Sequence, residues 1–279
     1  MSARLTRTLR KSRNARLGLG IVVVLLVIAL TSPWLATHDP RTQVIQDRLK
    51  APSAQYWLGT DTFGRDVFSR LVWGTRISFL LGFFSTGISS IIGTAMGIVS
   101  GYYGGWVDTI VMRVVDTLMS FPTILLAMAI VAILGPDLQN IVIAIALTFS
   151  PRFARVIRSV ALSVREQGYV LAARASGVRH GSIMWKHVLP NVVSSAIVLL
   201  TMQIGTAITM EASLSFLGLG GDPAIPTWGG VINDGRGFLQ QAPWISGFAG
   251  IAITVTVIGF NLLGDAIRDV LDPRFSKQL

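Results

Sequence analysis

Few side chains in this 279-residue sequence could carry out chemistry. Asp61 and Asp66 lie close enough in sequence to suggest the paired carboxylates of a glycosidase, but sequence spacing fixes no separation in space. No pattern typical of a substrate cleft accompanies them. We therefore expect these acids, together with the arginines beside them, to hold a turn rather than to cleave a substrate.

Metal and nucleotide chemistry have equally little support. The sequence contains no cysteine, no GxxxxGK[ST] phosphate-binding loop, no HExxH pair and no nucleophile elbow. His180 and His187 lie in a basic segment, far along the chain from His38, which does not favour a metal site. The sequence thus predicts a protein that is not an enzyme and has no cofactor of its own.

The acid that stands out is Glu211, which interrupts a long apolar stretch at residues 188–221. An ionisable group inside a membrane segment is costly and is a functional hypothesis by default. We take Glu211, Ser213 and Gln203 as candidates for lining a translocation path. The alternative is a structural glutamate at the outer mouth of a helix bundle, hydrogen-bonded to a neighbouring helix.

Composition indicates that membrane helices position these residues. Hydrophobic residues make up 51% of the chain and charged residues only 14%, against about 25% charged residues in typical soluble domains. The mean hydropathy is +0.60. The net charge of +10 does not predict nucleic-acid binding, because the basic residues cluster beside apolar segments, where they would face membrane lipid.

The apolar segments predict an all-α integral membrane protein with six transmembrane helices. Residues 1–16 form a basic cytoplasmic N-terminus, 17–37 a first transmembrane helix, 38–76 an external segment and 77–279 a five-helix core. A cleaved signal peptide is the alternative for the first helix, but the stretch is long and lacks a small-x-small cleavage site. The core spans are expected at residues 77–107, 107–136, 138–151, 188–221 and 237–264.

Two of these spans carry specific expectations. Gly93 and Gly97 form a GxxxG pair, which permits close contact between helices in lipid. Pro122 should kink or restart the third span, because proline removes a backbone donor. In the same span, Arg113 and Asp116 are spaced to pair on one helix face.

The fourth span is short, with only the uncharged residues 138–151 before the first arginine. Arg152, Arg155 and Arg158 are expected to reach lipid headgroups with their long side chains. If this segment did not cross, the basic residues 152–186 would lie outside, against the positive-inside rule. We therefore expect it to cross.

Residues 169–191 are rich in basic side chains and contain no acid. Helix formers predict a first helix over residues 169–176, ended by Gly177 as a left-handed cap. Ser182 could cap a second short helix, and Pro190 would occupy the first turn of the next span. The segment therefore predicts a helix–glycine–helix hairpin.

The hairpin resembles the cytoplasmic EAA loop of ABC importer permeases, through Leu171-Ala172-Ala173, Gly177 and Leu189-Pro190. The leading glutamate of that loop is missing, as it often is in the oligopeptide/dipeptide/nickel branch, so its ion pair with the ATPase cannot be carried over to Leu171. Three further strings resemble signatures of this branch: LGTDTFGRDVFSR at 58–70, WGGVINDGR at 228–236 and NLLGDAIRDVLDPR at 261–274.

The resemblance implies a type I ABC importer permease fold, with a coupling-helix hairpin in an EAA loop at 165–191. It implies a bacterial inner or plasma membrane location with both termini cytoplasmic. The implied partners are a homologous second permease, two ATP-binding subunits that hold ATP and Mg, and a periplasmic or lipid-anchored solute-binding protein. Residues expected to dock on the ATPases are Tyr169, Ala172, Ala173, Arg174, Gly177, Arg179, Ile183, His187, Leu189 and Pro190.

Several functions remain open on the sequence. Within the branch, the solute could be a peptide, nickel, a metal–chelator complex or a glutathione-like compound. An ion-coupled transporter or channel would be expected to carry more ionisable groups deep in its spans than Glu211 alone. An integral membrane enzyme would need a catalytic set that the sequence lacks. We favour the importer subunit, with peptides or similar small solutes as cargo.

Overall fold

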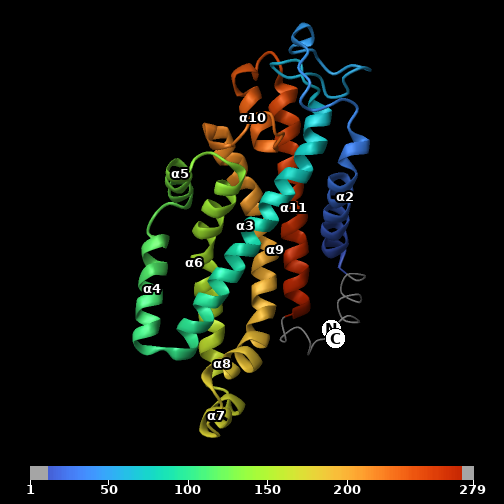
Figure 1. The fold of residues 1–279 in the computed structure, drawn as a ribbon. Coiled ribbons are helices and arrows are strands. Elements are labelled where there is room, and N and C mark those ends of the chain that lie inside the picture. The colour runs from blue at the N-terminus through green and yellow to red at the C-terminus, as the bar shows by residue number, and fades with distance from the viewer. Residues whose placement is uncertain (1–11, 272–279) are drawn as a thin grey trace.

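The computed structural model describes residues 12–271, and that part of the chain is almost entirely helical (Figure 1). The long helices are α2 (Arg13–Leu35), α3 (Val67–Tyr103), α4 (Gly105–Met119), α5 (Thr123–Leu134), α6 (Leu138–Arg165), α9 (Leu189–Leu214) and α11 (Pro243–Leu271). The short elements are η1 (Ile45–Asp47), α7 (Gly168–Ala175), α8 (His180–Ile183), η2 (Met184–Val188), η3 (Ser215–Leu219), α10 (Trp228–Gly235) and η4 (Arg236–Phe238).

Six membrane segments can be counted among the described residues, as predicted. Five helical stretches are long and apolar enough to cross a membrane, and α4 with α5 makes a sixth when the pair is counted as one broken span. The two halves of that pair are bent by 92°. The break falls at residues 120–122, so the prediction that Pro122 restarts the helix is confirmed. Proline has no amide hydrogen to continue the helix ladder.

The bundle has two distinct ends (Figure 1). The hairpin end carries α7 and α8, and the loop end carries residues 36–66 together with α10. The helix α3 begins at Val67, ten residues before the expected start of the second span. It begins there because the Asp66 side chain accepts a hydrogen bond from the Ser69 amide and caps the helix. Its early charged residue Arg70 is neutralised by acids, so charge does not end the helix.

The helices α3 and α6 form the most extensive helix pair in the bundle. A Cβ atom built at Gly93 would lie 2.4 Å from the Ser150 carbonyl oxygen, and one at Gly97 would lie 2.7 Å from the Ala154 carbonyl oxygen. Only hydrogen at these positions lets the two backbones approach so closely. The expectation that this GxxxG pair makes a close helix contact is confirmed, and its partner is α6.

The helix α6 is continuous for 28 residues and passes through Pro151, so it extends far beyond the 14 uncharged residues of the sequence. Two of its arginines do not reach toward headgroups as expected. Arg155 pairs with Asp116 at 2.7 Å, and Arg158 pairs with Asp108 on the same neighbouring helix, α4. The prediction that Arg113 pairs with Asp116 is therefore wrong, because the Asp116 carboxylate accepts a hydrogen bond from the Arg155 guanidinium of α6.

Candidate functional site

The hairpin (residues 168–188) connects α6 to α9 and has the predicted glycine break. After α7, Gly177 adopts a φ of +74°, and the Val178 amide bonds to the Ala173 carbonyl oxygen across the turn. This left-handed geometry is the one that glycine adopts without strain. The expected Ser182 cap is wrong, because α8 begins at His180, where Arg179 makes no side-chain cap. Pro190 lies in the first turn of α9, as predicted.

Apolar side chains and one polar contact anchor the hairpin to the bundle. Val170, Ile183 and Val188 are fully buried in a cluster that includes residues of α3 and α6. The Tyr102 hydroxyl of α3 lies 2.8 Å from the His180 Nδ1 atom, within hydrogen-bonding distance. The hairpin is thus attached to α3 and α6.

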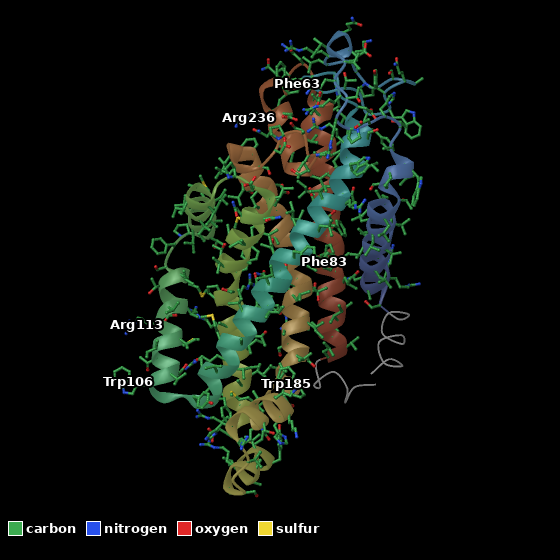
Figure 2. All side chains as sticks on the ribbon, viewed as in Figure 1. Phe63, Phe83, Trp106, Arg113, Trp185 and Arg236 are labelled. Carbon is green, nitrogen blue, oxygen red and sulfur yellow. The ribbon has the colours of Figure 1, made fainter. Side chains whose placement is uncertain are left out.

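The opposite side of the hairpin faces outward and is both basic and apolar. Of the residues expected to dock on a partner, six are exposed: Tyr169, Ala172, Arg174, Gly177, Arg179 and Pro190. Ala173, His187 and Leu189 are half-buried, and Ile183 packs inward. Trp185, which the sequence analysis did not single out, is 71% exposed at this end (Figure 2). An exposed apolar and basic surface of this kind suits contact with another protein.

At the loop end, four charged side chains form a buried ion network (Asp61, Arg65, Arg70 and Asp234). Asp61 accepts from the Arg65 Nε atom at 2.6 Å and from the Arg70 Nη1 atom at 2.8 Å. Asp234 lies 2.7 Å from Arg65 and 3.0 Å from Arg70. The arginine side chains are only 4% and 2% exposed. The structural role expected for these motif residues is confirmed.

The ion network joins two segments that are far apart in sequence. Arg65 also donates to the Pro223 carbonyl oxygen, while the Trp228 indole donates to the Leu71 carbonyl oxygen at 3.1 Å. The Trp244 indole donates to the Thr60 carbonyl oxygen at 3.2 Å. Both motif strings, at 58–70 and 228–236, therefore form one closed assembly. The role of Asp234 was not foreseen, because nothing in a single sequence pairs two such distant strings.

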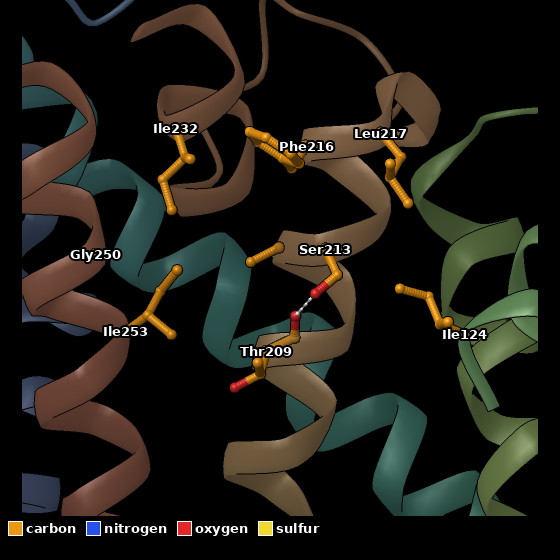
Figure 3. A pocket seen from close by; sticks show the side chains of 9 residues that line it. Ile124, Thr209, Ser213, Phe216, Leu217, Ile232, Gly250 and Ile253 are labelled. Atoms are coloured by element: carbon orange, nitrogen blue, oxygen red, sulfur yellow. Dashed lines mark hydrogen bonds between the residues drawn. The ribbon is translucent and has the colours of Figure 1, made fainter. Parts of the chain in front are cut away.

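Two of the cavities beside α9 each contain one candidate path residue. Ser213 lines a mostly apolar cavity of about 470 Å³, together with Phe216, Ile232 and Ile253 (Figure 3). Its hydroxyl donates to the Thr209 carbonyl oxygen at 2.8 Å. Gln203 lines a second cavity of about 400 Å³. We call these the Ser213 cavity and the Gln203 cavity.

Glu211 lies on the same helix but is fully buried. Its Oε1 atom accepts from the Ser215 hydroxyl at 2.8 Å, and its Oε2 atom has no partner in the described protein. The sequence offered a path-lining role and a structural one for this acid. In this conformation Glu211 is packed inside the helix bundle and faces no cavity that contains the other two candidates, so its role in the path stays a prediction.

Among residues 12–271, no group of three or more histidine or acidic side chains could hold a metal ion. The arrangement instead offers a helical bundle with cavities between its spans, a closed loop end and an exposed hairpin.

Comparisons with known proteins agree with this arrangement. Residues 93–277 match the family described as binding-protein-dependent transport system inner membrane component, and residues 3–52 match the N-terminal transmembrane domain of oligopeptide transport permease C. The chain is 45% identical over 268 residues to the dipeptide transport system permease protein DppC of Alkalihalophilus pseudofirmus, covering 96% of this chain and 88% of the relative. It is 44% identical to the glutathione transport system permease protein GsiD of Pectobacterium atrosepticum, covering 96% and 89% of the two chains.

Among solved structures, the chain resembles a chain of the MetNI methionine ABC transporter, determined in an inward-facing conformation. The TM-score is 0.58 and the sequence identity 20%, with 73% of this chain and 96% of that chain covered. At this identity the likeness concerns the fold.

Proposed function

This chain belongs to the family of binding-protein-dependent transport system inner membrane components and is a multi-pass permease subunit of a bacterial ABC importer; we propose that its solute is a peptide or a glutathione-like compound. The relatives named for dipeptide and glutathione transport support these solutes over nickel and metal chelates. Both kinds of solute are small peptides that carry free carboxylates.

Membership of the family implies ATPase subunits, a second permease and a solute-binding protein as partners. We propose that one copy of this chain pairs with a homologous permease and that two ATPases bind below them, holding ATP and Mg. The hairpin end would then face the cytoplasm, with both termini on that side, and the loop end would face a periplasmic or lipid-anchored binding protein.

The observation that carries the proposal is the hairpin, whose buried side is fixed to the bundle and whose exposed side carries Arg174 and Arg179. Closure of the ATPase pair on ATP would displace the hairpin. Since α6 enters the hairpin and α9 leaves it, the displacement would reach the cavities through two continuous helices. Motion of packed elements between two states, each favoured by a different ligand condition, is the general basis of such coupling.

Gentle purification of the chain from its host, followed by reconstitution of whatever stays bound, tests this proposal. We expect two P-loop ATPases and a second six-span permease to co-purify. Liposomes with this complex and its binding protein should accumulate dialanine or glutathione only when ATP is supplied. Solute uptake by the chain alone, without ATP, would instead favour an ion-coupled transporter.

A further inference from the structure

The Gln203 cavity lies where the broken span meets two continuous ones. Met119 and Phe121 line it at the bend between α4 and α5, while Thr148 and Arg152 line it from α6 and Gln203 from α9. Its volume of about 400 Å³ falls within the range of about 300–1,000 Å³ that is usual for small-molecule sites. Its lining combines apolar and aromatic surface with a few polar groups, as in binding pockets generally.

Arg152 differs from the other arginines of α6. Arg155, Arg158 and Arg165 each form a salt bridge with a carboxylate. Arg152 has no carboxylate partner within residues 12–271. Its Nη1 atom donates instead to the Gln203 Oε1 atom, at 3.2 Å. Gln203 is only 3% exposed, so this neutral partner is held firmly in the wall of the cavity.

The position of Arg152 makes this missing charge partner significant. Arg152 lies near the middle of the 28-residue α6, about 20 Å from either end at about 1.5 Å per residue. Gln203 also lies near the middle of its helix, α9. A cation this far from both ends of a helix that can cross the membrane is costly unless it faces water or an opposite charge. The cavity can supply the water, and an anionic solute can supply the charge.

We propose that Arg152, positioned by Gln203, contacts a carboxylate group of the transported solute in the Gln203 cavity. This inference rests on the proposed function and adds to it a contact in the path. A guanidinium binds a carboxylate at about 2.7–2.9 Å, closer than the 3.2 Å bond it makes to the glutamine. When the solute enters, the Arg152 guanidinium exchanges its bond to Gln203 for a stronger bond to the solute carboxylate. Because the Arg152 side chain is exposed, the solute is also free to leave.

The test uses the complete reconstituted complex with its binding protein, and two probes: dialanine and dialanine amide. Arg152→Gln should lower the ratio of dialanine to dialanine amide uptake by about tenfold, as expected for one lost charge-assisted bond. Arg152→Lys should recover part of the ratio. The matched control is Arg155→Gln, one turn along the same helix but outside the cavity lining, which should change uptake of both probes in the same proportion.

A second measurement does not depend on uptake of the amide. Because the chain has no cysteine, Arg152→Cys places a single thiol in it. Modification with a trimethylammonium-ethyl methanethiosulfonate should raise dialanine uptake, and modification with the sulfonato-ethyl reagent should lower it. Equal uptake after both reagents, or an unchanged probe ratio in Arg152→Gln, would overturn the carboxylate contact while leaving the importer assignment intact. Absence of any ATP-dependent uptake by the unmodified complex would overturn both.

Discussion

At the scale of single residues, the loop end depends on charges that are removed from water. Two arginines and two aspartates of the ion network neutralise one another at distances of 2.6–3.0 Å. Removing one partner of a buried pair is more costly than removing an exposed one, because the remaining charge stays buried without compensation. The ion network therefore fixes residues 60–70 to α10 more firmly than an exposed pair could.

Asp61→Asn should lower the stability of the purified chain by about 3–5 kcal/mol, because it leaves two buried guanidinium groups with one carboxylate. The matched control is Asp116→Asn, which breaks a pair with side chains 52% and 62% exposed and should cost no more than about 1 kcal/mol. Unfolding in detergent, followed by tryptophan fluorescence, measures both. Equal losses would mean that the ion network contributes no more than a surface pair.

A second residue-scale prediction concerns the loop before α3. Hydrogen bonds from Lys50 and from the Tyr56 hydroxyl, the latter at 2.6 Å, hold the pKa of Asp47 below its usual value. The folded protein therefore favours the carboxylate form of Asp47, and this side chain binds fewer protons in the folded than in the unfolded state. The loop should be stable above about pH 4, near the ordinary pKa of aspartate, and should loosen as the pH falls through the lowered pKa.

Tyr56→Phe removes one donor, so the folded-state pKa of Asp47 should be lowered less. The loss of protection should therefore be smaller in this variant and complete at a higher pH. Hydrogen exchange of the amides in residues 47–60, compared between the two proteins at matched pH, measures the shift. Coincident profiles would show that Tyr56 does not tune this carboxyl group.

The sequence predicted that the acids and arginines of the 58–70 string hold a turn, because a polar motif beside a membrane span has few other uses. It could not identify Asp234 as their partner, since long-range pairing leaves no periodic trace in one sequence. The arginines of α6 were predicted wrongly for a related reason. Their spacing suggested one shared role at the lipid headgroups, whereas Arg155 and Arg158 pair with acids on α4 and Arg152 donates to Gln203 on α9.

At the scale of helices, the glycines of α3 decide how closely this helix packs against α6. Gly97→Ala should lower the stability by about 1–3 kcal/mol, because its Cβ would meet the Ala154 carbonyl oxygen at 2.7 Å. The same substitution at Gly87, where no atom lies within 4 Å of the added Cβ, should leave the stability equal or slightly higher. Thermal unfolding in detergent distinguishes the two. Equal unfolding midpoints would mean that α3 and α6 can move apart at Gly97 without loss of stability.

The hairpin is the helical element most open to a functional test. Gly177→Val forces a β-branched residue to a φ of +74°, and Arg174→Glu reverses an exposed charge. We expect either change to reduce solute uptake per ATP hydrolysed while membrane insertion stays normal. The control is Gly181→Ala, which lies in α8 with no atom within 4 Å of the added Cβ. Normal coupling in both hairpin variants would rule out this docking surface.

Helix boundaries were predictable where a single strong local signal acts. Pro122 and Gly177 ended their helices as expected. The bounds of α3 and α6 were not predictable in the same way, because charged residues were taken as the edges of the spans. The edge residues Arg76 and Arg152 instead lie inside α3 and α6, and Arg152 donates to Gln203 of α9. Other charges of the two helices, those of Arg70, Arg155 and Arg158, are paired with acids on other elements and do not have to leave the bundle.

At the scale of the whole molecule, one continuous helix links the main features. The helix α6 packs against α3, pairs with α4, lines the Gln203 cavity and leads into the hairpin. A displacement applied at the hairpin end would therefore act on the bend between α4 and α5 through two salt bridges and one cavity wall. The six-span plan was evident from composition and apolar length, whereas this linkage depends on contacts between distant residues.

The exposed side of the hairpin should also affect how long the protein survives in the cell before it is degraded. Leu171 and Trp185 remain 46% and 71% exposed in the single chain. A copy made in excess of its partners would keep this apolar tip in water, where chaperones and proteases act on such surfaces. Surplus copies should consequently be short-lived, so the supply of partner subunits would set how much of this chain accumulates.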